Sequence, residues 1–324
     1  MQSKRLYALA IILMAWCSIT FAGLTGAEQK SKKAGIELYN QYMPATNELT
    51  VAAQAGDSDA QYYLAEELRR KSQYITPESL AWYEASAAQG NIYAMIKLGD
   101  RDSDLCKDMQ NCPPAKKTSQ EWLIEANRLA KSRSDKGDAE AMYLMYRLSG
   151  DRDWLQKSAE HGFAQASYLM GIGDRQGEGF FLLPSKRAAS VEAWMKASAE
   201  GQYPQGMMSY AAILAERGDI DGFNKWKEKA AGTGYASAVF DLACDLGHEP
   251  DKYSVPLDLV KSYGLLLLIS ELKGGGDIKE NLGEVFPKVK AKMTSQQIDE
   301  GSKFAEHWKD SHPPLSFFPD KLDR

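Results

Sequence analysis

The sequence predicts an all-α fold in which about six helix pairs stack into an α-solenoid. A glycine recurs six times, and each time small and large apolar residues follow it at the spacing of a helix face. A tryptophan lies seven or eight residues before four of these glycines. No alternation long enough for a β-strand accompanies them. The glycines are Gly56, Gly90, Gly137, Gly162, Gly201 and Gly234, and the tryptophans are Trp82, Trp154, Trp194 and Trp226.

The first 27 residues have the layout of a secretory signal peptide. Lys4 and Arg5 precede an uncharged, largely apolar stretch at 6–22, and small residues follow at two candidate cleavage sites, Ala22 and Ala27. We therefore expect residues 1–27 to be an export signal. A retained membrane anchor is the alternative, because the stretch approaches the length of a short membrane-spanning helix.

Composition and charge narrow the class of protein. The 324 residues are 26% charged and 44% hydrophobic, which excludes a disordered chain, and their formal net charge is −5. Residues 1–27 contribute two positive charges and no negative ones, so the remainder carries −7. An acidic chain lacks the positive field that a dedicated nucleic-acid binder needs. We expect no nucleic-acid partner, and membrane contact only through an uncleaved export signal.

Three cysteines remain after residue 27. Cys106 and Cys112 are close enough in sequence to close a small loop, and an exported chain meets an oxidising compartment, so we predict a disulfide between them. Two free surface thiols are the alternative, and zinc is disfavoured because no second ligand pair lies nearby. Cys244 lies in an apolar helical pattern and is expected to be a small buried residue.

The glycine and tryptophan patterns divide the chain into segments. Residues 28–50 are expected to form a lead-in helix, and residues 51–275 six repeats, each with a first helix, a loop and a second helix that ends at a glycine. The glycines are 25 to 47 residues apart, which indicates insertions in the loops within repeats. Residues 276–324 are expected to hold a capping helix and a tail, with the irregular stretch 312–319 laid over the last helices.

These residues resemble the Sel-one-like repeat, a relative of the tetratricopeptide repeat. The resemblance is carried by Gly-x-x-x-Ala-x-Tyr-x-Leu-Gly in the first helix and Trp-x-x-x-Ala-Ala-x-x-Gly at the end of the second, and covers residues 50–310. It implies a right-handed superhelix. The chain departs from the pattern in the fifth repeat, which has Gln205 for the alanine, and in the sixth, which lacks the tryptophan motif.

A solenoid exposes a long concave surface, and the sequence indicates which residues line it. We expect positions three, seven and ten after each glycine to face the groove and bind a partner, the alternative being an ordinary solvated face. The loop 177–184 adds large apolar residues that either pack on the array or anchor a partner. The predicted partner-binding residues are Tyr63, Glu66, Lys97, Asp100, Leu144, Arg147, Ile172 and Asp241 in the groove, with Phe180 and Phe181 in the loop.

Catalytic patterns are incomplete throughout the chain. Ser270 and Lys273 match the Ser-x-x-Lys nucleophile motif of penicillin-recognising enzymes, but the other two motifs of that chemistry are missing. The histidines do not have the spacing of a zinc hydrolase, and no dinucleotide-binding fingerprint follows a strand. We therefore expect no enzyme activity, no cofactor and no metal.

Two functions of different classes are compatible with these features. Exported members of the Sel-one-like family of this size resemble immunity proteins against antibacterial phospholipases delivered by type VI secretion. The resemblance implies a periplasmic protein that binds such an effector and covers its catalytic cleft. An acidic chain suits a partner with a basic rim around that cleft. The alternative is an envelope scaffold or adaptor that organises other proteins, and a β-lactamase-like enzyme is a distant third.

Overall fold

The computed structural model describes residues 23–249 and 255–322. Within these residues the chain forms seventeen α-helices and one short 3-10 helix, Asp100–Ser103, and no β-strand. The predicted all-α solenoid is confirmed. The expected export signal lies largely outside the described residues, and none of the described helices has the length and apolar character needed to cross a bilayer.

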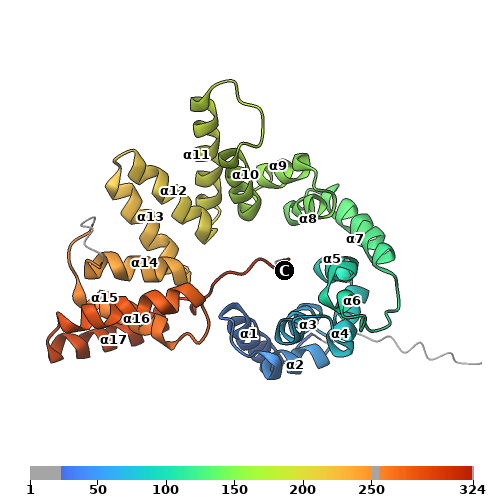
Figure 1. Ribbon diagram of the computed structural model, residues 1–324, viewed down its shortest axis with the longest axis horizontal. Helices are drawn as coiled ribbons and strands as arrows, with labels where there is room; N and C mark the ends of the chain where they lie inside the picture. Colours follow the sequence, from blue (N-terminus) through green and yellow to red (C-terminus); the bar gives the residue numbers. More distant parts are fainter. Residues whose placement is uncertain (1–22, 250–254, 323–324) are drawn as a thin grey trace, which may run out of the picture.

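Each of the six predicted repeats is a pair of adjacent helices (Figure 1). The pairs are α3 (Ser58–Ser72) with α4 (Pro77–Ala88), α5 (Ile92–Gly99) with α7 (Ser119–Ser134), α8 (Ala139–Ser149) with α9 (Arg152–Glu160), α10 (Ala164–Gln176) with α11 (Pro184–Glu200), α12 (Pro204–Glu216) with α13 (Ile220–Gly232), and α14 (Ala236–Gly247) with α15 (Leu259–Glu271). The short α6 (Leu105–Asp108) lies in the insertion of the second repeat. The irregular glycine spacing reflects loop insertions, as predicted, and also helix length: α8 and α9 have 11 and 9 residues, whereas α10 and α11 have 13 and 17.

The repeated glycines form the turns between pairs. Five of the six have a φ between 82° and 93°, the left-handed region that favours glycine. In the fifth repeat Gln202 takes the left-handed conformation instead, with a φ of 64°, and Gly201 serves another purpose. A Cβ on Gly201 would lie 2.6 Å from the Cβ of Ala164, so glycine there permits the close approach of two helices.

A buried serine joins the two helices of three repeats. Ser86, Ser158 and Ser198 each lie four residues after a repeat tryptophan. Each donates its hydroxyl to a carbonyl in the first turn of the preceding helix, at 2.7, 2.6 and 2.7 Å respectively. A buried hydroxyl needs such a partner, so the tryptophan motif extends to Trp-x-x-x-Ser and specifies the packing within the pair.

Each end of the repeat array has one more helix than the sequence predicts. Two helices, α1 (Gly26–Asn40) and α2 (Thr46–Gln54), lie where one lead-in helix over 28–50 is expected. A capping box between Thr25 and Glu28 begins α1. After the last repeat, α16 (Gly276–Ala291) and α17 (Ser295–Ser311) both pack on α15, where one capping helix is expected.

The helices follow an arc that closes on itself through the last residues of the chain. The tail, residues 312–322, leaves α17 and runs inside the arc (Figure 1). The side chain of Gln41 donates to the carbonyl of Leu315 at 2.8 Å, and the amide of Phe317 donates to the carbonyl of Asn40 at 3.0 Å. The first part of the tail lies on the last helices, as expected, because Leu315 and Phe317 belong to the same apolar cluster as residues of α14, α15 and α17. The tail continues past α14 to the first repeats, because the curved solenoid brings the end of α1 within reach of it.

Candidate binding surfaces

The concave groove is occupied by the protein's own tail. The tail begins against the turn before α14, where the amide of Ser316 donates to Gly234 and its carbonyl accepts from Ala236, both at 2.9 Å. It then crosses to α8 and α3, on the opposite side of the arc. The groove is therefore a surface that already binds a polypeptide segment.

Asp320 is the most strongly held residue of the tail. Its Oδ2 accepts from Arg147 Nη1 at 3.0 Å, from the Tyr143 hydroxyl at 3.0 Å and from Gln165 Nε2 at 2.9 Å. Arg147 also donates to the Tyr143 oxygen at 2.7 Å. Burial and the Asp320 carboxylate raise the pKa of Tyr143 well above its ordinary value, so its hydroxyl stays protonated and donates. We name Tyr143, Arg147 and Gln165 the carboxylate subsite.

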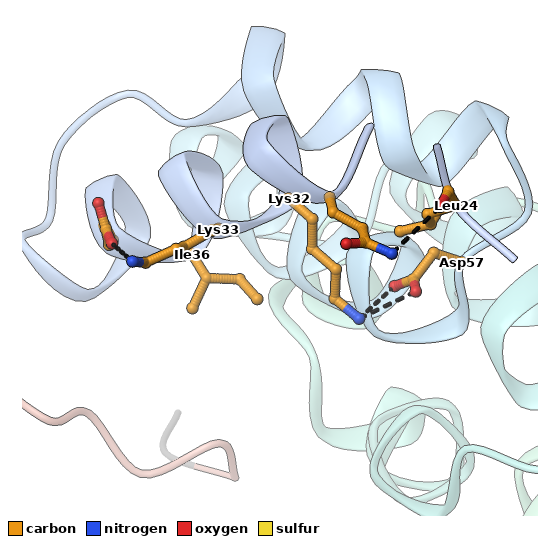
Figure 2. Close-up of a pocket in the computed structure, with 7 residues that line it drawn as sticks. Leu24, Lys32, Lys33, Ile36 and Asp57 are labelled. Atoms are coloured by element: carbon orange, nitrogen blue, oxygen red, sulfur yellow. Dashed lines mark hydrogen bonds and ion pairs between the residues drawn. The ribbon is translucent and has the colours of Figure 1, made fainter. Parts of the chain in front are cut away.

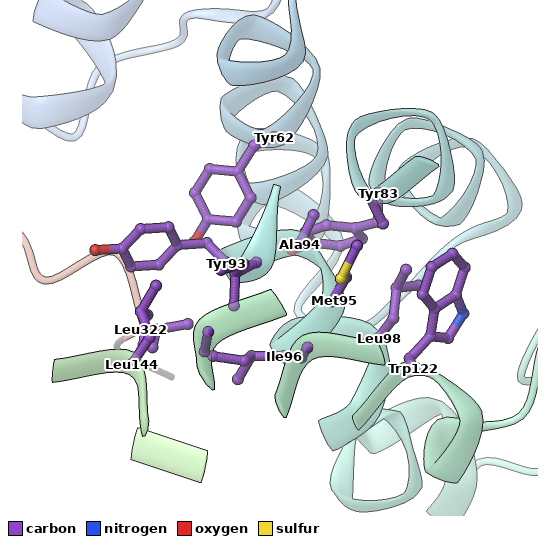
Figure 3. Packing of buried hydrophobic residues seen from close by; sticks show 14 of the residues in the cluster. Tyr62, Tyr83, Tyr93, Ala94, Met95, Ile96, Leu98, Trp122, Leu144 and Leu322 are labelled. Atoms are coloured by element: carbon purple, nitrogen blue, oxygen red, sulfur yellow. The ribbon is translucent and has the colours of Figure 1, made fainter. Parts of the chain in front are cut away.

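Leu322 anchors the end of the tail in an apolar pocket. Only 6% of its surface is exposed, and it belongs to the core cluster that contains Ile96 and Leu144 (Figure 3). The preceding residue is held through its main chain, because its carbonyl accepts from the Tyr62 hydroxyl. The Lys321 ammonium lies over the Tyr93 ring, 4.6 Å from its centroid. Asp320 thus contacts a guanidinium, Lys321 an aromatic ring and Leu322 an apolar cluster.

Two clefts remain open beside the tail. One, of about 300 Å³, is lined by aromatic residues including Tyr63, Tyr93 and Tyr203, together with Asp320. The other, of about 650 Å³, lies between Arg69 and Arg70 on α3 and the tail at Pro319–Asp320. Solvent therefore reaches both sides of the tail near the carboxylate subsite.

Several predicted groove residues lie on the concave side but are covered. Glu66 and Lys97 are both buried and form an ion pair at 3.3 Å, and Glu66 also accepts from the Tyr83 hydroxyl at 2.6 Å. Leu144 is 1% exposed in the same cluster as Leu322. None of these three residues presents a free surface to a partner, because Glu66 and Lys97 pair with each other and Leu144 packs in the cluster that Leu322 enters.

The remaining predicted groove residues do not form one surface. Arg147 contacts the tail, and Tyr63 packs its ring against Tyr39 at a centroid distance of 5.2 Å. Asp100 is exposed beside a small cleft that also contains Leu322. Two residues lie in other environments: Ile172 packs in a separate apolar cluster, and burial raises the pKa of Asp241, which the nearby Lys227 opposes. That these positions bind a partner stays a prediction.

The sequence left open whether the apolar residues of the loop between α10 and α11 pack on the array or stay exposed to anchor a partner. In the structure one packs and others are exposed. Phe181 packs, because the Arg187 guanidinium lies over its ring at 4.9 Å. Phe180 and Leu182 project into solvent, with 87% and 84% of their surfaces exposed, and Leu183 is also exposed. We name Phe180, Leu182 and Leu183 the apolar loop patch.

The base of this loop is held by hydrogen bonds. Arg187 Nη1 donates to the carbonyls of Asp174 at 2.8 Å and Glu178 at 3.0 Å. A cleft of about 690 Å³ lies beside it, lined by apolar residues together with Arg175, Arg187, Glu216 and Arg217, the last of which pairs with Glu192. The apolar loop patch is therefore presented from a fixed base next to a mainly apolar cleft with charged residues of both signs.

The insertion of the second repeat contains the predicted disulfide. Cys106 and Cys112 are bonded, which confirms the prediction, and Cys106 is buried. The buried Asp104 fixes this segment to the core by accepting from the amides of Ile75 at 2.9 Å and Cys106 at 3.0 Å. The loop is thus held from two sides. Cys244, predicted to be buried, is half-buried and free.

Two other places resemble a site in shape or in sequence motif, but neither has the side-chain arrangement of a binding or catalytic site. An open cleft beside α1 is lined by Leu24, Ile36 and Lys32, whose ammonium pairs with Asp57 at 2.8 Å and so ties α1 to the start of α3 (Figure 2). Ser270 donates its hydroxyl to its own helix, at the carbonyl of Leu267, 2.6 Å away. Among the described residues, no cluster of three or more metal-binding side chains is found.

Sequence reasoning missed Tyr143, Gln165 and Asp320. Tyr143 and Gln165 are six and three residues after repeat glycines, positions that the pattern assigns to core and groove respectively. Asp320 lies in a tail that carries Leu315, Phe317 and other apolar residues instead of the polar residues of a solvated end. That composition was the available signal of a buried tail.

No family model matches the chain, and no curated protein matches it. Solved structures do show similarity. A protective antigen of uropathogenic Escherichia coli with an SLR fold is 19% identical, with a TM-score of 0.48, over 89% of this chain; the chain spans only 62% of that structure's length. A Sel1 repeat protein from Oxalobacter formigenes is 17% identical, with a TM-score of 0.42, over 88% of this chain and 87% of its own. An immunity protein from Pseudomonas aeruginosa is 14% identical, with a TM-score of 0.40, over 72% and 82%.

Proposed function

We propose that this chain is a periplasmic protein-binding solenoid that acts as an immunity protein: it binds an antibacterial effector of the phospholipase class, delivered by type VI secretion, and covers its catalytic cleft. The observation that carries the proposal is the apolar loop patch, Phe180, Leu182 and Leu183, exposed on a fixed base. The choice of an effector as partner rests on the resemblance of the repeats to the Sel-one-like family.

Exposed aromatic and aliphatic side chains in a cluster favour burial against another protein. Interfaces obtain most of their binding free energy from a few well-packed residues near their centre. A loop held at its base by Arg187 loses less conformational entropy on binding than a mobile one. The patch therefore has the features of an anchor that inserts into a partner's cleft.

The net charge of the whole chain favours association with a basic partner. Residues 28–324 carry a formal net charge of −7. An enzyme that acts on anionic lipids benefits from basic residues around its cleft, and opposite charges raise the rate of association. The periplasmic location is supported by the predicted export signal and by the Cys106–Cys112 bond, since disulfides persist in oxidising compartments.

The test is protection of cells that lack this chain. The deletion strain is challenged by sibling cells that deliver each phospholipase effector in turn, and is complemented with the full chain or with a Phe180→Ser, Leu182→Ser variant. We expect the full chain to restore survival and the double variant to fail, because it lacks both anchors. The matched control is Ile124→Ser, which removes an exposed apolar side chain from α7.

Two results would contradict the proposal. Survival of the deletion strain against every effector would exclude an immunity role. Full protection by the double variant would show that the apolar loop patch is not the anchor. If the chain binds an envelope protein at this loop without inhibiting an enzyme, the scaffold function replaces the immunity function.

A further inference from the structure

We propose that the concave groove is a binding site for an extended polypeptide segment with a carboxylate side chain followed two residues later by an aliphatic one, and that the tail is an internal ligand of this site. The proposed function places a partner at the apolar loop patch, on another part of the molecule. This inference adds a second binding site and is independent of the first.

The groove recognises main-chain atoms that every polypeptide has. Gln41 donates to the carbonyl of Leu315, Tyr62 to that of Lys321, and Arg147 Nη2 to that of Leu322 at 3.2 Å. These contacts follow the path of the tail from one side of the arc to the other. Recognition of carbonyls by side chains gives affinity for an extended segment without requiring its full sequence.

The carboxylate subsite supplies specificity at one position. Three donors from α8 and α10 converge on a single oxygen of Asp320, all within 3.0 Å. The Asp320 and Arg147 side chains are 17% and 26% exposed, so solvent screens this ion pair only in part. A neutral or basic residue at this position would leave the guanidinium without its partner.

An aliphatic subsite lies two residues further along. Leu322 enters the cluster that contains Ile96 and Leu144 (Figure 3). The carboxylate subsite and this pocket share Arg147, which donates both to Asp320 and to the carbonyl of Leu322. Arg147 therefore fixes the two-residue spacing between the acidic and the aliphatic side chain of the bound segment.

The groove is organised by contacts of its own. Tyr143 is fully buried, packs against the Phe163 ring at 5.2 Å and accepts from Arg147. The tail makes only one isolated bridge, between Ser316 and Tyr235, and belongs to no helix or sheet. A preorganised groove filled by a segment without secondary structure, with clefts on both sides, is suited to exchange of that segment for another.

The first experiment separates the groove from its internal ligand. A chain that ends at Pro314 is mixed with a fluorescein-labelled peptide of residues 315–322, and binding is followed by anisotropy. We expect the shortened chain to bind the peptide at least tenfold more tightly than the full chain, whose groove is filled. An Asp320→Asn peptide and an Arg147→Ala groove are each expected to weaken binding at least tenfold. Arg128→Ala, an exposed residue of α7, is the matched control and leaves binding unchanged.

The second experiment releases the tail in the full chain. Asp320→Lys puts a cation beside Arg147, and Asp320→Glu keeps the charge. We expect amide hydrogen exchange in residues 315–322 to accelerate at least tenfold in the lysine variant, uptake of the free peptide to appear, and the helices to stay protected. The glutamate variant is expected to retain slow exchange and to exclude the peptide.

Three results would overturn the proposal. A folded, shortened chain that does not bind the peptide, or binds a scrambled one equally well, would show that the groove has no such specificity. Loss of helical structure in both the shortened chain and Asp320→Lys would show that the tail is an integral part of the fold. Slow exchange of the tail in Asp320→Lys would show that the carboxylate subsite does not hold it. None of these results bears on protection through the apolar loop patch.

Discussion

The tail and the α10–α11 loop are both irregular segments rich in large apolar residues, yet they have opposite environments. Leu322 of the tail is 6% exposed, whereas Phe180 of the loop is 87% exposed. Side chains of the groove donate hydrogen bonds to the carbonyls of the tail and to its Asp320 carboxylate. The loop is held near its base, by Arg187 and by the ion pair between Arg152 and Glu178. Apolar composition alone therefore does not decide whether a segment is buried. The tail is buried because its polar groups also find hydrogen-bond partners.

The largest expected effect is on the free energy of unfolding, and it tests the burial of the side chains beneath the tail. Leu144→Ala removes a fully packed side chain beneath Leu322 and leaves a cavity, so we expect the free energy of unfolding to fall by about 3 kcal/mol. Leu182→Ala, the matched change on the loop, is expected to alter it by less than about 0.5 kcal/mol. Urea denaturation of both variants measures the difference. Equal effects would contradict the burial of Leu144 beneath the tail and the exposure of Leu182 on the loop.

The next effect tests the ion pair of the tail. Arg147→Ala removes the charge partner of Asp320, and we expect a loss of about 2 kcal/mol, below the range for fully buried pairs because both side chains are partly exposed. Thermal unfolding measures it. Arg175→Ala beside the loop cleft is the comparison and is expected to have little effect on stability. A midpoint for Arg147→Ala equal to that of the unchanged chain would show that the pair adds nothing.

A third prediction concerns pH. Burial, with the nearby Asp59 as a smaller cause, raises the pKa of Tyr63 to about 12, and burial also raises the pKa of Tyr62, Tyr93 and Tyr143. Their unfolded pKa is near 10, so the unfolded state loses these protons first. This contribution to stability is therefore complete below pH 10 and decreases as pH rises above it.

The measurement is urea denaturation at pH 9 and at pH 11, with phenolate absorbance followed in parallel. We expect lower stability at pH 11 and a phenolate signal from these tyrosines that appears only with unfolding. Stability unchanged between the two values would disprove the assigned burial. The loop at 177–183 contains no tyrosine, so its variants are expected to leave this pH dependence unaltered.

The smallest expected effect tests the exposed segment. Phe180→Ser is expected to change the free energy of unfolding by less than about 0.5 kcal/mol, because the side chain makes little contact with the rest of the chain. Partner binding is expected to weaken at the same time by about tenfold or more. A large loss of stability, measured by urea denaturation, would mean that the loop packs on the array.

The helix pairs could be predicted from the sequence because their signals are local. Left-handed glycines lie at most of the turns between pairs; Gly90 and Gly162, for example, both have a φ of 90°. The path of the tail could not be predicted in this way. It depends on the curvature of the whole solenoid, which brings Gln41 next to Leu315, 274 residues later. Of the residues expected in the groove, Arg147 contacts the tail, but Asp320, which fills the carboxylate subsite, comes from outside the repeats.

The same dependence on long-range packing explains why two predicted groove residues, Glu66 and Lys97, are covered. Glu66 and Lys97 have the charge of a solvated face, and their positions after the glycines put them on the groove side. Their mutual ion pair and their burial arise from packing between repeats and from the tail, neither of which periodicity reveals. The loop differs, because its insertion between helices and its four apolar residues already indicated either packing or an anchor.

Amide hydrogen exchange of the full chain tests the central claim most directly, by comparing residues 315–322 with residues 179–183. The amides of Ser316 and Phe317 donate to carbonyls of Gly234 and Asn40, so we predict exchange in the tail at least a hundredfold slower than in an unstructured peptide. The loop is predicted to exchange close to the unstructured rate. Rapid exchange in both segments would show that the groove is empty in solution and would contradict the account.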